Sequence, residues 1–248
     1  MSIELLSEVL KSSDNIVFFG GAGMSTESGI ADFRSERGLY KTSNGYEYPP
    51  ETMLSHSFFL SHTDDFYKFY KEKMIFKNAT PNVGHIALAK LEEIGKLKAV
   101  ITQNIDGLHQ LGGSKKVFEL HGSVHRNNCT KCHSFFDLDF IINSKDVPIC
   151  PHCGGIVKPD VVLYEEALDD GVVNGAVNAI QKADILIIGG TSLVVYPAAG
   201  LINYFRGKKL ILINKSSTPY DSKADIVIHD AIGKVLSQAV NVCYNLQN

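Results

Sequence analysis

The sequence has no tryptophan, only five cysteines among 248 residues, and no apolar run that approaches membrane-spanning length. Hydrophobic residues make up 44% and charged residues 21%, so the chain can bury a full core and has no low-complexity character. A net charge of -3 provides no general basic field of the kind that non-specific DNA binding requires. We therefore expect a globular monomer with no membrane partner and no direct nucleic-acid partner.

The first twelve residues lack the features of a secretory signal. Glu4 and Glu8 interrupt the apolar pattern, and no basic segment precedes it. We expect a cytoplasmic protein, in which thiols stay reduced and paired cysteines bind metal more readily than they form disulfides.

Four of the five cysteines form two Cys-x2-Cys pairs that are separated by 17 residues, namely Cys129, Cys132, Cys150 and Cys153. This spacing is typical of a tetrahedral zinc site, because each pair places two thiolates on one tight turn. Four thiolates leave no coordination position for water, so the pattern predicts one structural Zn²⁺. Two disulfides or a redox pair remain the less favoured alternatives.

Short β-branched runs that alternate with helical patterns predict an α/β fold with a largely parallel sheet. The expected strands are Ile16–Phe19, Ala99–Thr102, Val117–Leu120, Val161–Tyr164, Ile185–Ile188, Leu210–Ile213 and Ile226–Ile228. Two stretches, 35–79 and 124–158, break the alternation and are predicted to form a small lobe.

Two helices have clear sequence signals. One covers Ile3–Leu10. The other covers Asn82–Ile94, with Thr80 as the expected N-cap, Pro81 in the first turn and Gly95 as the left-handed stop.

A glycine-rich turn, Gly20 to Thr26, follows the first expected strand directly. Such a turn lets backbone N–H groups approach a pyrophosphate, although a purely structural turn gives the same pattern. The dehydrogenase fingerprint is incomplete, because Thr26 stands where the third glycine is expected and no ribose-binding acid follows about 20 residues on. Hydride transfer is therefore the poorer interpretation.

Polar residues follow several of the expected strands, and the carboxyl ends of parallel strands meet in one crevice. They are Gln103, Asn104, Asp106, His121, Thr191, Ser192 and Asn214. A single histidine is more often structural than catalytic, but in this company His121 is the leading candidate for a general base.

Taken together, these motifs resemble those of the sirtuins, NAD-dependent protein lysine deacylases, in a short bacterial-type form. The resemblance spans nearly the whole chain and rests on Gly21–Arg34, Thr102–His109, His121-Gly122, the four cysteines and Gly190–Leu193. It implies a Rossmann-like large domain of residues 1–34, 80–123 and 159–248. It also implies a small domain of residues 35–79 and 124–158, made of a helical insertion and a zinc module.

The resemblance also implies residue roles. NAD would contact Gly21, Ala22, Gly23, Thr26, Asp32, Phe33, Arg34, Gln103, Asn104, Ile105, Asp106, His121, Gly190, Thr191, Ser192, Asn214, Lys215 and Ile232. Substrate peptide would pair with Val161, Val162, Leu163 and Tyr164. The catalytic residues would be His121, Asn104 and Asp106.

The implied reaction transfers the acetyl group of an acetyl-lysine protein or peptide to ADP-ribose, with release of nicotinamide. His121 would act as the general base on a ribose hydroxyl. The alternatives are an ADP-ribosyltransferase that uses the same NAD site, and a non-catalytic zinc-containing binding module.

Two departures from the family pattern concern the substrate. Glu165 stands where the family commonly has glycine, beside the strand that is expected to pair with peptide. Members that prefer acidic acyl groups have a Tyr-x-x-Arg pair, whereas this chain has Tyr70 followed by Lys73. We therefore expect short uncharged acyl groups to be preferred, with Arg37 and Lys41 as the first cations to test if they are not.

Overall fold

The computed structural model describes residues 2–33, 35, 38–42 and 45–244. Its largest element is a six-stranded parallel sheet with the order β3-β2-β1-β7-β8-β9. The strands are β1 (Ile16–Gly20), β2 (Leu97–Thr102), β3 (Val117–Glu119), β7 (Ile185–Gly189), β8 (Lys209–Ile213) and β9 (Ile226–Ile228). The predicted α/β class with a Rossmann-like sheet is confirmed.

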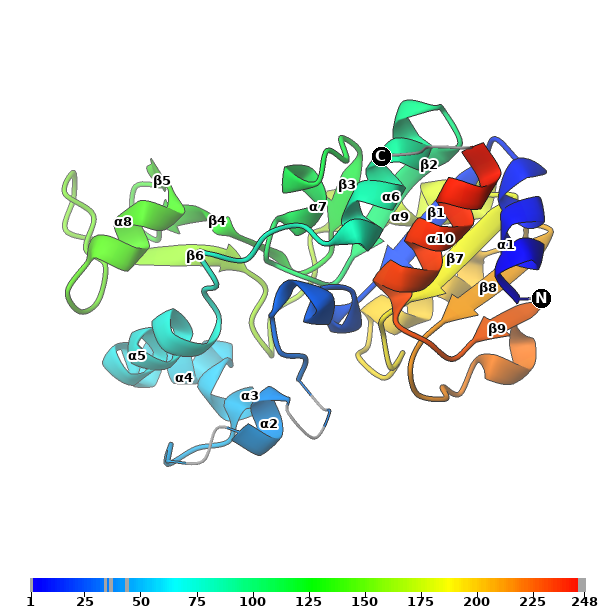
Figure 1. Cartoon of the computed structure of the whole chain (residues 1–248). Helices are drawn as coiled ribbons and strands as arrows, with labels where there is room; N and C mark the ends of the chain where they lie inside the picture. The colour runs from blue at the N-terminus through cyan, green and yellow to red at the C-terminus, as the bar shows by residue number, and fades with distance from the viewer. Residues whose placement is uncertain (1, 34, 36–37, 43–44, 245–248) are drawn as a thin grey trace.

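Helices cover both faces of this sheet (Figure 1). On one face, Phe18 joins the core under α1 (Ser2–Lys11), α6 (Val83–Glu93) and α10 (Ile232–Tyr244). On the other face, Phe19 joins the core under α9 (Asp170–Lys182) and the 3-10 helix η3 (Ala198–Tyr204). Successive strand residues point to opposite faces, so burial on both sides explains why the strands read as continuous apolar runs.

Six of the seven predicted strands lie in the parallel sheet, and the seventh was wrong. The chain from Val157 to Val161 forms β6, which pairs antiparallel with β4 (Gly122–Cys129) in a separate sheet. β6 ends where Val161–Tyr164 was expected to begin, and Tyr164 makes only an isolated bridge to Ser55. An extended apolar run signals an extended backbone, and it does not determine which sheet the segment joins.

The helix expected at Asn82–Ile94 is present as α6, but its predicted cap was wrong. Asn82, not Thr80, caps it: the Asn82 side chain accepts from Gly84 N and His85 N, while the His85 ring accepts from Asn82 N. This reciprocal pair satisfies amide groups at the helix start that would otherwise lack partners. Gly95 has φ +76 and gives the predicted left-handed stop.

The small lobe combines the two stretches that interrupt the alternation (Figure 1). Its helices are α2 (Leu39–Thr42), α3 (Pro50–Met53), α4 (His56–Ser61), α5 (Thr63–Lys73) and α8 (Leu138–Asn143), and its sheet has the order β5-β4-β6 with β5 at Phe135–Phe136. Both stretches contribute to one core, in which Phe66 and Tyr70 from α5 lie with Val157 and Val161 from β6. The two insertions therefore pack as a single body, while the exact domain boundaries stay a prediction.

The remaining short helical elements are η1 (Ala22–Met24), η2 (Thr26–Ser28), α7 (Leu108–Leu111) and η4 (Asp221–Lys223). Within the part of the chain that the structure describes, no helix combines the length and apolar character needed to cross a bilayer.

Candidate active site and metal centre

The glycine-rich loop leaves β1 and turns back against the end of β7. Gly23 N donates to Gly190 O at 2.7 Å, and a Cβ added at Gly23 would lie 2.7 Å from Gly190 Cα. Only residues without side chains permit this approach, which keeps the loop low over the ends of the strands. Glu27 anchors the far side of the loop, because its Oε1 accepts from Gly233 N at the start of α10 at 2.8 Å.

Gln103 and Thr191 connect the ends of the three central strands. Gln103 N donates to Gly20 O at 3.0 Å, and Gln103 Nε2 donates to Thr191 Oγ1 at 3.1 Å. These contacts bring the polar residues after β1, β2 and β7 into one crevice, as the strand order requires.

Asn104 and Asp106 meet at Ser25 of the glycine-rich loop. Asn104 Nδ2 donates to Ser25 Oγ at 2.9 Å, and Ser25 Oγ donates to Asp106 Oδ2 at 2.6 Å. Leu108 N donates to the other Asp106 oxygen at 2.9 Å. Burial raises the pKa of Asp106, and the Ser25 and Leu108 hydrogen bonds oppose that shift in pKa.

His121 follows β3 and enters the crevice from the side of β2. Its Nδ1 lies 2.9 Å from Gln103 O. A carbonyl oxygen only accepts, so Nδ1 carries the proton and Nε2 keeps the lone pair that a base needs. Burial lowers the pKa of His121, and the hydrogen bond to Gln103 O opposes that shift in pKa.

Several other residues predicted to bind the cofactor lie apart from the Ser25–Asp106 contacts. Asn214 follows β8, where its Nδ2 donates to Ser216 O at 2.7 Å, and Lys215 beside it is exposed. Ile232 is 3% exposed and packs on Gly189, in the core below the crevice. Phe33 is half-buried and lies edge-on to Tyr40.

Asp32 Oδ1 accepts from Ser35 N at 2.7 Å. Arg34, which was assigned to the cofactor loop, lies outside the described residues, as does Arg37.

The segment predicted to hold peptide lies between the small lobe and the crevice. Val161 and Leu163 point into the small-lobe core, whereas Val162 is half-buried and Tyr164 is 40% exposed. Val162 N donates to His121 O at 3.0 Å, so this segment joins the backbone of the candidate base directly.

Glu165 adopts the left-handed conformation that favours glycine, with φ +76. Its carboxylate accepts from Ser57 N at 2.9 Å and from Ser57 Oγ at 3.0 Å, in the first turn of α4. The strain of about 1–2 kcal/mol for such a residue is offset by these bonds to the end of a helix. The residue that departs from the family pattern therefore fixes the loop to the helical insertion.

Ser25 and Glu27 were missed as site residues by the sequence reasoning. Both lie inside the glycine motif, but a hydroxyl or an acid in a turn has many structural uses, and only the fold shows their partners across the chain.

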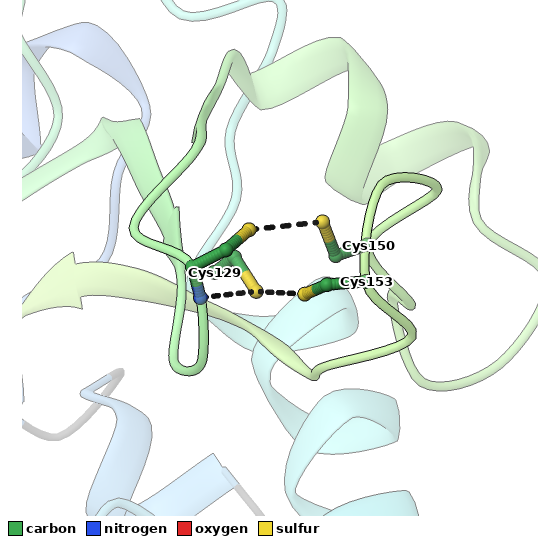
Figure 2. A group of neighbouring side chains, drawn as sticks. Cys129, Cys150 and Cys153 are labelled. Carbon is green, nitrogen blue, oxygen red and sulfur yellow. Dashed lines mark hydrogen bonds between the residues drawn. The ribbon is translucent and has the colours of Figure 1, made fainter.

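The four cysteines lie together at the far end of the three-stranded sheet, and Figure 2 shows Cys129 close to Cys153, with Cys150 beside them. All four sulfur atoms lie within 4.8 Å of one another, with Cys129 Sγ and Cys153 Sγ 3.4 Å apart and Cys132 Sγ and Cys150 Sγ 3.6 Å apart. A tetrahedral zinc with Zn–S bonds of about 2.3 Å requires S–S separations of about 3.8 Å. The thiols therefore fit one structural zinc that is closed to water.

Comparison with known proteins places this geometry in a family. The model of the Sir2 family matches residues 21–197, which include the motifs described above except the residues after β8. The chain belongs to the Sir2 family. The resemblance to sirtuins is thereby confirmed.

Proteins called NAD-dependent protein deacetylase are similar to this chain over nearly its whole length. The one from Clostridium acetobutylicum is 65% identical, covering 96% of this chain and 98% of the relative, and the one from Clostridium tetani is 67% identical over 95% and 96%. A Sir2 structure described with p53 peptide and NAD+ has a TM-score of 0.86 at 38% identity and covers all of both chains.

Proposed function

We propose that the protein is an NAD-dependent protein lysine deacetylase that transfers the acetyl group of acetyl-lysine to ADP-ribose and releases nicotinamide. The observation that carries the proposal is that His121 Nδ1 binds Gln103 O, next to Asn104, which the Ser25 hydroxyl links to Asp106. Sir2 relatives with the deacetylase name share this chain's full length, and a Sir2 structure is described as bound to acetylated peptide.

The crevice fits the parts of NAD. The glycine-rich loop would allow close approach of the pyrophosphate, with Gly21, Ala22, Gly23, Thr26, Gly190, Thr191 and Ser192 around it. Because the Gly21, Gly23 and Gly190 N–H groups donate to backbone carbonyls, these glycines would contribute close approach and not hydrogen bonds. NAD supplies the ribose carbon to which the acyl oxygen bonds as nicotinamide leaves. Asp106 and Ile105 would hold the nicotinamide carboxamide, Gln103 and Asn104 the adjoining ribose, and Asn214 with Lys215 the adenosine side.

His121 would take a proton from a ribose hydroxyl during acetyl transfer. Its Nδ1–H bond to Gln103 O fixes the ring orientation and the tautomer, so Nε2 is the basic atom. The lowered pKa of His121 keeps the ring neutral at physiological pH. Asn104 would hold the ribose and Asp106 the nicotinamide carboxamide near this base. The Ser25 hydroxyl, which binds both side chains, would fix their positions.

Acetyl-lysine peptide would enter beside Val162 and Tyr164, the accessible members of the segment that the Glu165 carboxylate ties to Ser57. Because Glu165 is held by α4, the loop needs little ordering when peptide binds. A monomeric cytoplasmic enzyme without a nucleic-acid partner remains the expectation.

The helical insertion favours uncharged acyl groups. Tyr70 is fully buried and stacks on Phe66 in the small-lobe core. Lys73 pairs at 2.8 Å with the carboxylate of its exposed neighbour Glu72, so the cation nearest to the expected Arg position lies at the surface. An acidic acyl tail would lose its hydration without a fixed cation in return.

The test is to incubate the protein with NAD and an acetyl-lysine peptide and to follow the products by mass spectrometry. We expect NAD-dependent loss of one acetyl group from the peptide, with nicotinamide formed in equal amount. Tight NAD binding without nicotinamide release would instead favour the non-catalytic binding module.

A further inference from the structure

One segment of the three-stranded sheet contacts both the loop that carries Asp106 and residues next to His121. Ser123 of β4 pairs with Asp160 and Asn127 pairs with Pro159, so residues 124–126 bulge out between two consecutive partners on β6. Bulges of this kind bend a strand and redirect its side chains, and they occur often beside active sites. The three bulge residues are Val124, His125 and Arg126.

The first two bulge residues hold the loop that carries Asp106. Val124 N donates to Ile105 O at 3.0 Å, and His125 Nε2 donates to Asp106 O at 3.1 Å. Gly107 has φ +73, and a Cβ added there would lie 2.7 Å from His125 Cδ2, so the imidazole lies directly on this glycine. The conformation of the Ile105–Gly107 backbone is therefore matched to the position of His125.

The third bulge residue binds two carboxylates, one from Glu119 just before His121 and one from Asp160, which lies against Gly122. Arg126 Nη1 donates to Glu119 Oε2 at 2.6 Å, and Arg126 Nε donates to Asp160 Oδ2 at 2.7 Å. Glu119 ends β3 of the parallel sheet, two residues before His121, and its side chain is only 8% exposed. A planar guanidinium can reach two carboxylates at once, which a lysine ammonium on its flexible stem does less well.

The backbone that follows His121 is tightly packed against Asp160. Gly122, which follows His121, has φ +73, and a Cβ added there would lie 1.8 Å from Asp160 O. A change in the position of Asp160 or Glu119 would therefore move Gly122 and His121 with it.

We propose that the 124–126 bulge is a positioning device for the deacetylation reaction, in which His125 sets the Asp106 loop and Arg126 sets the His121 backbone. The proposal rests on the deacetylase function proposed above. β4 ends at Cys129, so the bulge also connects the metal centre to the catalytic loops through one continuous strand. His125 and Arg126 act through other residues and are not catalytic themselves.

The charge of Arg126 has a second consequence. The pKa of Asp106 is raised mainly by burial, and the negative charge of Glu119 raises it further. By neutralising Glu119, Arg126 helps Asp106 stay ionised in the crevice.

Three variants test the two parts of the proposal: Arg126→Met, Arg126→Lys and His125→Ala. Lys209→Met is the control, because Lys209 makes an ion pair at 3.1 Å with Asp225 and begins β8, at the opposite end of the parallel sheet from the crevice. Each variant is assayed for deacetylation kcat and KM, for nicotinamide exchange, for NAD affinity and for zinc content.

For Arg126→Met we expect kcat to fall about tenfold while NAD affinity changes less than about twofold, because misplaced groups affect rate more than ground-state binding. Arg126→Lys should recover part of that loss. For His125→Ala we expect nicotinamide exchange to fall about fivefold, more than acetyl transfer, because its contact is to the Asp106 loop. Lys209→Met should match the wild type.

The proposal is overturned if Arg126→Met keeps kcat within about twofold of the wild type, or if the variants lose stability with no change in the ratio of exchange to transfer. Should Arg126→Met fail to fold, His125→Ala decides by the ratio of exchange to transfer, since it leaves both ion pairs of Arg126 in place. If the wild type is active and the variants keep its activity, only the positioning role of the bulge is refuted. If the wild type is inactive, the deacetylase function is refuted as well.

Discussion

The two sheets of this protein are stabilised in different ways. The parallel sheet has aliphatic cores on both faces, with Ile187 on one side and Leu186 on the other, and needs no ligand to bury its apolar surface. The three-stranded sheet is short, and β5 has only two residues. The small lobe has an aromatic core of its own, and the cysteines lie at its far end, where a metal would add a cross-link. The residues proposed for catalysis follow strands of the parallel sheet. The zinc site would stabilise the small lobe, whose bulge is proposed to position those residues.

Breaking the metal centre should have the largest effect. We expect Cys150→Ala to lose zinc and to fold poorly, because three thiolates no longer complete the tetrahedron and metal binding contributes directly to folding. Zinc content and circular dichroism measure the outcome. Cys243→Ala is the control, since Cys243 lies in α10 and away from the cluster. A well-folded Cys150→Ala protein without metal would show that the small lobe does not need zinc.

Removing the base should stop the reaction while leaving both sheets intact. We expect His121→Ala to lower kcat by about 10²–10⁴-fold with little change in NAD affinity, because a general base acts on rate more than on binding. Steady-state kinetics and calorimetric NAD binding measure the two quantities. Turnover close to that of the wild type would remove His121 from the role of base.

The same assignment predicts the pH profile. A base is active when neutral, so deacetylation should hold as pH falls to about 6.5, the ordinary imidazole pKa, and decline only below it, because burial lowers the pKa of His121. If activity already declines above pH 7 as the pH is lowered, protonation of His121 is not the cause of the decline.

How far the sequence predicts the structure differs between the two sheets. Six strands of the parallel sheet and the polar residues at their ends could be predicted, because parallel strands place their carboxyl ends together whatever the loops do. The four cysteines could be grouped from spacing alone. In the small lobe, local patterns are less informative: Val161–Tyr164 was wrong because long-range pairing decides which sheet an extended segment joins.

The β4 bulge and the Glu165–Ser57 contact have no local signal either. Val124, His125 and Arg126 continue the strand without a glycine or proline to mark the irregularity. Glu165 and Ser57 lie far apart in the sequence, and only the docking of α4 brings them together.

Acyl choice tests the part that the helical insertion plays. Matched acetyl and succinyl peptides of one sequence should differ by about tenfold or more in kcat/KM in favour of acetyl, because no bidentate Arg follows Tyr70 at the family's position to meet a carboxylate. Better turnover of succinyl peptide would show that another cation lines the channel, with Arg37 and Lys41 as the first to replace.

A smaller effect should separate nicotinamide binding from acetyl transfer. We expect Asp106→Asn to weaken nicotinamide exchange several-fold, because in the proposed function its carboxylate would accept from the carboxamide. Exchange of labelled nicotinamide into NAD measures this. Unchanged exchange would mean that Asp106 serves only to cap Leu108 and Ser25.

The most direct test of the central claim is the fate of the ADP-ribosyl group. Sir2 structures are described with acetyl-ADP-ribose, which is the product expected here as well. In a reaction with NAD and acetyl-lysine peptide, mass spectrometry should find ADP-ribose carrying one acetyl group and peptide that has lost it. ADP-ribose attached to the peptide or to the protein, with the acetyl-lysine intact, would contradict the account and identify an ADP-ribosyltransferase.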